Sequence, residues 1–167
     1  MTTPTKSSTE ALASHLVPNP TRRDPNLPIP ADLYFKSQTY PSNHPVASKY
    51  EGYFNLKHQR HWIGKMIYKS GAVYDGDWIE NRKFGQGSYY YPQSNDYAIK
   101  YEGTIQNGNY SGLGSLHYKN GDIYKGQWED NKKCGYGVIV YSEGDKIRDR
   151  YEGYYSDDLR HGNGRIL

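Results

Sequence analysis

The chain has 167 residues and a formal net charge of only +3, and Leu, Ile, Val and Phe together account for 27 of its residues. So few aliphatic side chains exclude a Leu-rich helical bundle, whereas 19 Tyr and 3 Trp favour strands. The small net charge argues against disorder of the whole chain, and the length suits one domain with an appended arm.

The first segment, residues 1–49, holds eight of the nine prolines and none of the 18 glycines. Proline at this density prevents a helix or a central strand, so we expect an extended or disordered Pro-rich arm that ends near Tyr50. Its apolar residues cluster late and could anchor the arm on its own sheet or on a neighbouring protein, the alternative being a passive tail. These candidate anchors are Leu33, Tyr34, Phe35 and Tyr40.

The second segment, residues 50–167, repeats one pattern. Tyr-x-Gly motifs begin units at residues 50, 74, 101, 124 and 151, and a large side chain follows four positions after each Tyr. Two glycines then follow, eleven and thirteen positions after the Tyr. The first unit departs from this pattern, because its hairpin is one residue longer and Trp62 stands where the first glycine belongs. Repetition at a fixed period indicates a stack of similar supersecondary units.

Alternation within each unit indicates a β-hairpin. Tyr74, Gly76 and Trp78 share one face of a strand, whereas Asp75 and Asp77 share the other. Glycine on the apolar face leaves a slot into which a neighbouring aromatic ring can lie. Five hairpins in succession predict ten strands in an elongated, single-layer antiparallel sheet.

These motifs resemble the MORN (membrane occupation and recognition nexus) repeat, in which Tyr-x-Gly-x-Trp, a short loop, Gly-x-Gly and a closing Tyr follow one another. The resemblance covers residues 50–167 and implies an all-β sheet with an aromatic groove that can hold a peptide. Such arrays occur in ciliary radial spokes, cytoskeletal scaffolds and junctional membrane proteins. They also occur beside kinase and methyltransferase domains, for which this chain has no room. The resemblance therefore implies a non-catalytic scaffold within a multi-subunit assembly, in the cytoplasm, the cytoskeleton or the axoneme of a cilium or flagellum.

The aromatic stripe of the repeat is the candidate protein-binding face. A single-layer sheet leaves its apolar face open unless its own twist, the arm or another protein covers it. In the simpler interpretation the same side chains are only the core of the repeat. The residues concerned are Tyr74, Trp78, Tyr89, Tyr101, Tyr124, Trp128 and Tyr141.

Basic residues recur in the loops before the glycine pairs, and stacked hairpins would place them along one edge. This edge suggests an alternative function, a membrane-associated adaptor that binds anionic phospholipid headgroups weakly. Solubilising loop charge explains the pattern equally well. Nucleic acid is not expected, because the repeat needs its aromatic residues inside. The basic residues are Lys57, Arg60, Arg82, Lys83, Lys132, Lys133 and Arg160.

The sequence predicts no catalytic, cofactor or metal site. His58, His61, His161 and Cys134 fall in hairpin loops of different units, and no phosphate-binding loop or nucleophile elbow is present. Cys134 is the only cysteine, so it has no partner for an intramolecular disulfide. The longest aliphatic run, residues 138–140, is too short to span a bilayer.

Two further features concern the borders of the sheet. The connections at residues 92–100 and 142–150 are longer than those of the other units and are expected to form two protruding β-fingers. The last strand, residues 164–167, is expected to leave a bare edge. Such an edge invites strand addition by a second copy or by a partner's extended segment.

Overall fold

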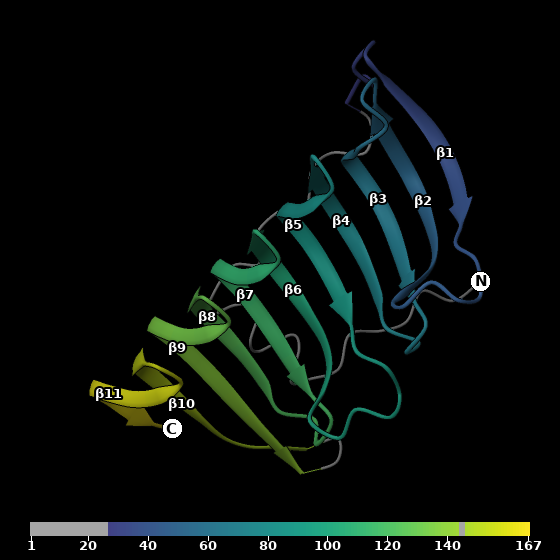
Figure 1. The fold of residues 1–167 in the computed structure, drawn as a ribbon. Coiled ribbons are helices and arrows are strands. Elements are labelled where there is room, and N and C mark those ends of the chain that lie inside the picture. Colours follow the sequence, from purple (N-terminus) through teal and green to yellow (C-terminus); the bar gives the residue numbers. More distant parts are fainter. Residues whose placement is uncertain (1–26, 144–145) are drawn as a thin grey trace.

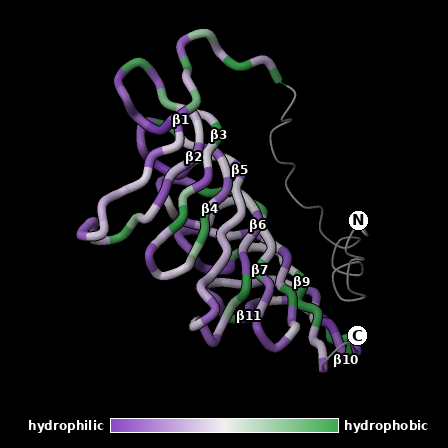
Figure 2. Tube along the Cα trace, turned by 90° about the vertical axis from the view of Figure 1, so that its right-hand side faces the viewer, coloured by the Kyte–Doolittle hydropathy of each residue, from purple (hydrophilic) through white to green (hydrophobic). Residues whose placement is uncertain are grey.

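The computed structural model describes residues 27–143 and 146–167. This part of the chain forms one antiparallel sheet of 11 strands arranged in sequence order (Figure 1). Figure 2 shows the strands stacked one behind another as a single layer, with hydrophilic residues prominent at the turns. No helix occurs among the described residues, and none that could cross a membrane is therefore found there.

The strands have these bounds: β1 (Leu33–Thr39), β2 (Ala47–Asn55), β3 (Arg60–Tyr68), β4 (Val73–Ile79), β5 (Arg82–Tyr90), β6 (Ala98–Gln106), β7 (Asn109–Tyr118), β8 (Ile123–Glu129), β9 (Lys132–Glu143), β10 (Lys146–Ser156) and β11 (Leu159–Ile166). The five sequence repeats correspond to the hairpins β2–β3, β4–β5, β6–β7, β8–β9 and β10–β11. The expected all-β, single-layer architecture is thus confirmed.

A row of glycines crosses the sheet and accommodates the repeat tyrosines. Gly76 faces both Gly64 and Gly87 in register, and the row continues in this way from Gly52 on β2 to Gly164 on β11. A Cβ atom on Gly87 would lie only 2.6 Å from the ring of Tyr74. The Tyr74 hydroxyl reaches across the glycines and donates to the carbonyl oxygen of Asp77 at 2.9 Å. The slot expected from the sequence is therefore present.

The core lies on the sheet face that carries the Tyr-x-Gly tyrosines, which we call the groove face. The large residue four positions after each Tyr is buried there. The Nε1 atom of Trp78 donates to the carbonyl oxygen of Gly64 at 2.9 Å, and Trp128 does the same to Gly114 at 3.2 Å. The tyrosine and the large residue of each unit thus form one continuous cluster along the sheet. The buried large residues are Phe54, Trp78, Ile105, Trp128 and Tyr155.

The hairpin tips are tight turns that need left-handed backbone conformations. In the tip between β4 and β5, Glu80 and Asn81 have φ values of 47° and 69°, the pattern of a type I′ turn. The first glycine of each Gly-x-Gly pair also has positive φ, for example 81° at Gly85. Trp62, which replaces this glycine in the first unit, keeps the same conformation with φ of 70°.

The arm contributes a strand, so the sheet has one strand more than the ten predicted from the repeats. Strand β1 pairs with β2 along its whole length, from Leu33 opposite Asn55 to Thr39 opposite Lys49. Tyr34 stacks on Phe54 with ring centroids 5.8 Å apart. The sheet therefore begins before residue 50, because no proline interrupts the stretch between Pro30 and Pro41. The part of the arm at residues 1–26 lies outside the described residues.

The two long connections differ from each other. The prediction of a β-finger is wrong for residues 92–100, because residues 92–97 form a compact turn and residues 98–100 already belong to β6. There the Asn95 side chain accepts the backbone N–H groups of Tyr97 and Ala98, both at 2.8 Å. At residues 142–150 the ladder does continue, with Lys146 opposite Glu143. The tip of this second connection, residues 144–145, lies outside the described residues.

Candidate functional site: a groove crossed by tyrosine pairs

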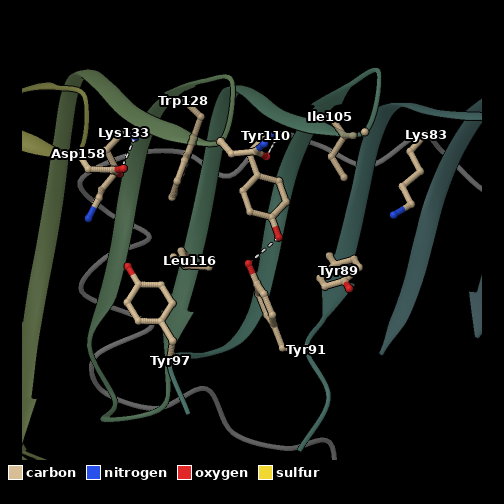
Figure 3. A pocket seen from close by; sticks show the side chains of 12 residues that line it. Lys83, Tyr89, Tyr91, Tyr97, Ile105, Tyr110, Leu116, Trp128, Lys133 and Asp158 are labelled. Carbon is tan, nitrogen blue, oxygen red and sulfur yellow. Dashed lines mark hydrogen bonds between the residues drawn. The ribbon is translucent and has the colours of Figure 1, made fainter. Parts of the chain in front are cut away.

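Three adjoining cavities of about 380, 500 and 370 Å³ lie along the groove face. The first and second share Lys83 and Gly108 among their lining residues. The second and third share Tyr97 and Lys133. The cavities are therefore sections of one groove that runs across the strands, and Figure 3 shows its middle section.

The groove is crossed at regular intervals by what we call the cross-groove pairs. Each pair joins the tyrosine that closes one unit to the residue that follows the hairpin tip of the next unit. In Figure 3, Tyr110 points from the side of the hairpin tips toward Tyr91 on the opposite side, and their hydroxyl groups are 2.7 Å apart. Four pairs are in contact: Tyr68 with Lys83, Tyr91 with Tyr110, Tyr118 with Lys133, and Tyr141 with Arg160. Tyr40 of the arm and Arg60 line the first cavity together and are counted as the fifth pair.

Four of the five residues at the hairpin tips in these pairs are cations, and each also lies over the Tyr-x-Gly ring of its own unit. The Nζ atom of Lys83 is 5.1 Å from the ring centroid of Tyr74, and that of Lys133 is 5.5 Å from Tyr124. The guanidinium groups of Arg60 and Arg160 occupy the equivalent places. These distances are within the range of cation–π attraction. Arg60, Lys83 and Lys133 are thus partly buried against aromatic rings, whereas Arg160 contacts the rings and stays exposed.

The middle position carries a tyrosine in place of a cation. Tyr110 stacks on Tyr101 with ring centroids 3.6 Å apart and an interplanar angle of 6°. Its hydroxyl bonds to Tyr91, and burial together with this contact raises its pKa well above the usual range. The centre of the groove is therefore neutral and is flanked by cations on both sides.

Burial and mutual repulsion act on the lysines of the groove. Burial, and secondarily the charge of Arg60, lowers the pKa of Lys83 to about 8. Burial also lowers the pKa of Lys133, although the nearby carboxylate of Asp158 opposes this effect. The first cavity is lined by Arg60, Arg82 and Lys83 and by no described Asp or Glu. Glu80 lies 3.6 Å from Arg82, whereas no described carboxylate pairs with Arg60 or Lys83, so this section of the groove carries net positive charge.

The seven aromatic residues that the sequence predicts as a protein-binding face fall into a buried group and a partly exposed group. Tyr74, Trp78, Tyr101, Tyr124 and Trp128 are buried and form the floor of the groove. Tyr89 and Tyr141 are partly exposed and stand at its surface. Five further tyrosines line the groove and were not singled out from the sequence: Tyr68, Tyr91, Tyr97, Tyr110 and Tyr118. Three of them, Tyr68, Tyr91 and Tyr118, could have been identified as the closing Tyr of a unit.

The seven basic residues do not form one edge, which corrects the arrangement expected from the sequence. Neighbouring residues of a strand point to opposite sides, so Lys83 and Lys133 lie partly buried in the groove, whereas Arg82 and Lys132 are exposed at the tips. Arg82 also lines the first cavity from its tip. Lys132 pairs with Asp157 at 2.8 Å. Lys57 is exposed in the first hairpin tip, and Arg60 and Arg160 join the cross-groove pairs.

The remaining candidate features lie apart from the groove. All of strand β11 is exposed, and its outer edge has no neighbouring strand among the described residues.

No group of His, Cys, Asp and Glu in the described ranges could hold a metal ion. His58 contacts the Tyr34 hydroxyl at 2.6 Å, which shows a structural contact for this loop histidine. Burial raises the pKa of the Cys134 thiol, which makes it a weaker nucleophile at neutral pH.

A family model, the MORN repeat, matches residues 74–95, 101–123, 124–146 and 151–167. These segments begin at the Tyr of four Tyr-x-Gly motifs, and together they make up just over half of the chain. No curated protein matches the sequence.

Proposed function

The chain belongs to the MORN-repeat family, whose repeats are structural interaction modules, and from this premise we propose that its groove holds an extended segment of a partner protein. The protein then acts as a non-catalytic scaffold in a larger assembly. The family resemblance supports an assembly of the cytoskeleton or of a ciliary or flagellar axoneme, reached from the cytoplasm.

The observation that carries this proposal is the groove itself. Its floor is already packed by the buried tyrosines and tryptophans, so a partner meets a formed surface and does not have to complete a core. Tyr97, with 61% of its surface exposed, stands at the junction of the second and third cavities. A groove that crosses about eight strands at ~4.8 Å spacing is long enough for an extended segment of roughly twelve residues.

The groups within the groove support binding and give no support to catalysis. The lysines and tyrosines engage one another, and burial raises the pKa of Tyr68 to about 12, so this phenol stays protonated at neutral pH. His44 lines the first cavity, but its Nδ1 atom accepts the backbone N–H of Ala47 at 2.9 Å. These groups are therefore used for packing and orientation.

The proposal is tested by a matched pair of tyrosine substitutions. Tyr97→Ala removes an exposed ring from the groove, whereas Tyr154→Ala removes a ring that is 52% exposed and packs against Tyr136 outside it. Tagged wild-type and variant chains are purified from ciliated cells, and the co-purifying proteins are quantified by mass spectrometry. We expect Tyr97→Ala to lose a specific set of partners that Tyr154→Ala retains. Equal recovery with both variants would place recognition elsewhere.

The alternative function, binding of anionic lipid headgroups, has few exposed cations to rely on. Of the seven basic loop residues, the exposed ones are Lys57, Arg82, Lys132 and Arg160. Arg82 lies 3.6 Å from Glu80, Lys132 is paired with Asp157, and Arg160 donates to the Tyr141 hydroxyl. Exposed cations contribute only ~1 kcal/mol each near an anionic surface. We therefore expect little co-sedimentation with phosphatidylserine vesicles at physiological salt. Strong, salt-sensitive co-sedimentation would favour the adaptor function.

Strand addition at β11 is a second mode of association that we propose alongside the groove. The exposed backbone edge and the exposed side chain of Ile166 suit pairing with a second copy or with a partner's strand. Sedimentation of the wild-type chain and of Ile166→Lys tests this mode. A dimer that the lysine variant loses supports it, whereas a monomer at all concentrations excludes pairing between copies.

A further inference from the structure

We propose that the groove selects an acidic partner segment in the polyproline-II conformation, with carboxylates on every third residue facing the cations of the cross-groove pairs. This inference rests on the proposed function and specifies the chemistry of the occupant. It follows from the spacing of the pairs, from their charge and from their place inside the groove.

The spacing identifies the conformation of the segment. One cross-groove pair occurs per hairpin, so successive pairs are separated by two strand spacings, or about 10 Å. A polyproline-II helix has three residues per turn and advances ~3.1 Å per residue, so side chains three apart lie on one side about 9.3 Å from each other. In a β-strand, side chains on one face recur about every 6.6 Å and would fall out of step with the pairs.

The charge identifies the side chains of the segment. Arg60 and Lys83 line the first cavity together, and no described Asp or Glu is within ion-pair distance of Lys83. Two nitrogen atoms of Arg60 donate to Asn81, which is uncharged. A carboxylate placed between these cations would relieve the repulsion that contributes to the lowered pKa of Lys83.

The second half of the groove repeats this arrangement, but carboxylates of the chain itself compensate part of its positive charge. Lys133 donates to the Tyr118 hydroxyl at 3.2 Å, and its backbone N–H donates to Asp158 at 3.0 Å. In the third cavity, Asp96 lies 3.2 Å from Lys119, and Asp122 accepts the backbone N–H of Ser142 at 2.8 Å. We therefore expect carboxylates to contribute most in the first cavity and less near Lys133.

The neutral middle pair sets the centre of the segment. Tyr91 and Tyr110 satisfy each other, and the apolar side chains of Ile105 and Leu116 lie beside them (Figure 3). A carboxylate here would face no cation and would lose hydration without compensation. The matching segment thus has an uncharged residue at its centre and acidic residues three and six positions to either side.

The position of the cations favours a polypeptide over a membrane. Lys83 lies among the rings of Tyr68, Tyr74 and Tyr89, with its Nζ atom 5.0–5.1 Å from each centroid. The groove containing it lies between the hairpin tips and the connections at the other edge of the sheet (Figure 3). A flat headgroup layer cannot follow the groove from one section to the next, whereas a single chain can.

The test uses the full chain and fluorescein-labelled synthetic peptides in an anisotropy titration. The first peptide is built of Pro-Pro-Glu triplets with one Pro-Pro-Leu triplet at its centre. The second has the same composition with its glutamates adjacent to one another, and the third has Gln in place of every Glu. We expect the first peptide to bind about tenfold more tightly than either control, and high salt to weaken it.

Variants locate the binding. Lys83→Gln is expected to weaken the first peptide about tenfold, because it removes a cation from the groove. Lys57→Gln removes the same charge from an exposed loop and should change binding less than twofold. Lys133→Gln, in the groove, and Lys132→Gln, its control at the neighbouring exposed position, form a second matched pair. Melting curves establish that each variant is folded, and the comparison of peptides on the unmodified chain does not depend on any variant.

Three results would overturn the inference. Equal affinity for spaced and clustered glutamates would exclude the triplet register. Equal affinity for the Gln peptide would exclude selection by charge while leaving the groove as a peptide site, so the proposed function would survive. Binding of phosphatidylserine vesicles that is lost in Lys83→Gln would identify a lipid as the anionic ligand.

Discussion

At the scale of single residues, the glycine row is required because a tyrosine ring lies on it. A Cβ atom on Gly87 would approach the Tyr74 ring to 2.6 Å, whereas one on Gly162 would meet nothing within 4 Å. We expect Gly87→Ala to lower the free energy of unfolding by about 3 kcal/mol through overpacking. Gly162→Ala should cost only about 1 kcal/mol, from its φ of 61°. Urea denaturation measures both, and equal losses would contradict the packing explanation.

Trp62 is the residue at which packing and backbone conformation conflict. Its side chain is only 8% exposed and packs on Tyr53 with centroids 4.8 Å apart, but its φ of 70° favours glycine. Trp62→Gly and Trp62→Ala both lose this contact, and only the glycine variant relieves the backbone. We expect the glycine variant to be more stable than the alanine variant by about 1 kcal/mol, the reverse of the usual order in strands. Urea denaturation of the two variants decides the order.

At the scale of elements, the hairpins could be predicted, whereas the first strand was expected only as an extended arm segment that could anchor on the sheet. Regular spacing of Tyr-x-Gly and Gly-x-Gly defines β2 to β11, because the glycine of the first motif and the second glycine of the other both lie against a tyrosine side chain. Strand β1 has no glycine, and Lys36 stands opposite Gly52 where the glycine row ends. Only the connection after β1 resembles the repeats: Tyr40-Pro41 precedes β2 in the same way as Tyr91-Pro92 precedes β6. A repeat that keeps its connection and loses its glycines is therefore missed.

Removal of β1 gives a prediction for this element. Deleting residues 1–40 leaves five complete hairpins but uncovers the edge of β2 and the ring of Phe54. We expect the truncated chain to stay folded, to melt at a lower temperature and to self-associate as its concentration rises. Tyr34→Ala in the full chain should reproduce part of the thermal loss without exposing the edge. Analytical ultracentrifugation with circular dichroism checks this; unchanged melting and a monomeric state would contradict it.

At the scale of the whole molecule, the sequence indicated the aromatic face, and the family resemblance implied a groove on it, but neither showed which residues line that groove. The closing tyrosines and the residues that follow the next hairpin tip are 15–20 positions apart in sequence, and they meet only because the hairpins stack in register. Alternation along β5 leaves Lys83 partly buried among the rings and Arg82 exposed at the tip, which a count of basic residues does not reveal. The floor of the groove is therefore predictable from the motif, whereas its accessible lining depends on the assembled sheet.

The buried titratable groups predict how stability depends on pH. Lys83 has a folded pKa of about 8, below the ordinary ~10.4, so its burial penalty is fully present below pH 8 and is lost between these values. Relative to Lys83→Met, the wild-type chain should gain about 1 kcal/mol from pH 7 to pH 10, because partial exposure screens the effect. Above pH 10 stability should fall, since unfolded tyrosines ionise there while burial raises the pKa of Tyr101 and its equivalents.

The urea titrations that measure this dependence are compared between the two chains at each pH. Lys133 and the tyrosines are common to both, so the difference between the curves isolates Lys83. A difference that does not change between pH 7 and pH 10 would show that the Lys83 ammonium is fully hydrated, and the cation–π arrangement of the groove would be wrong.

Photocrosslinking tests most directly the central claim that the groove face recognises a partner segment. A benzophenone amino acid is introduced at Tyr97 in the groove or, as the control, at Tyr154 outside it. Irradiation in the cell and peptide-level mass spectrometry then identify what each position touches. The account predicts that position 97 crosslinks a defined segment of another protein and that position 154 does not. Crosslinks to the same segment from both positions, or from position 154 alone, would contradict it.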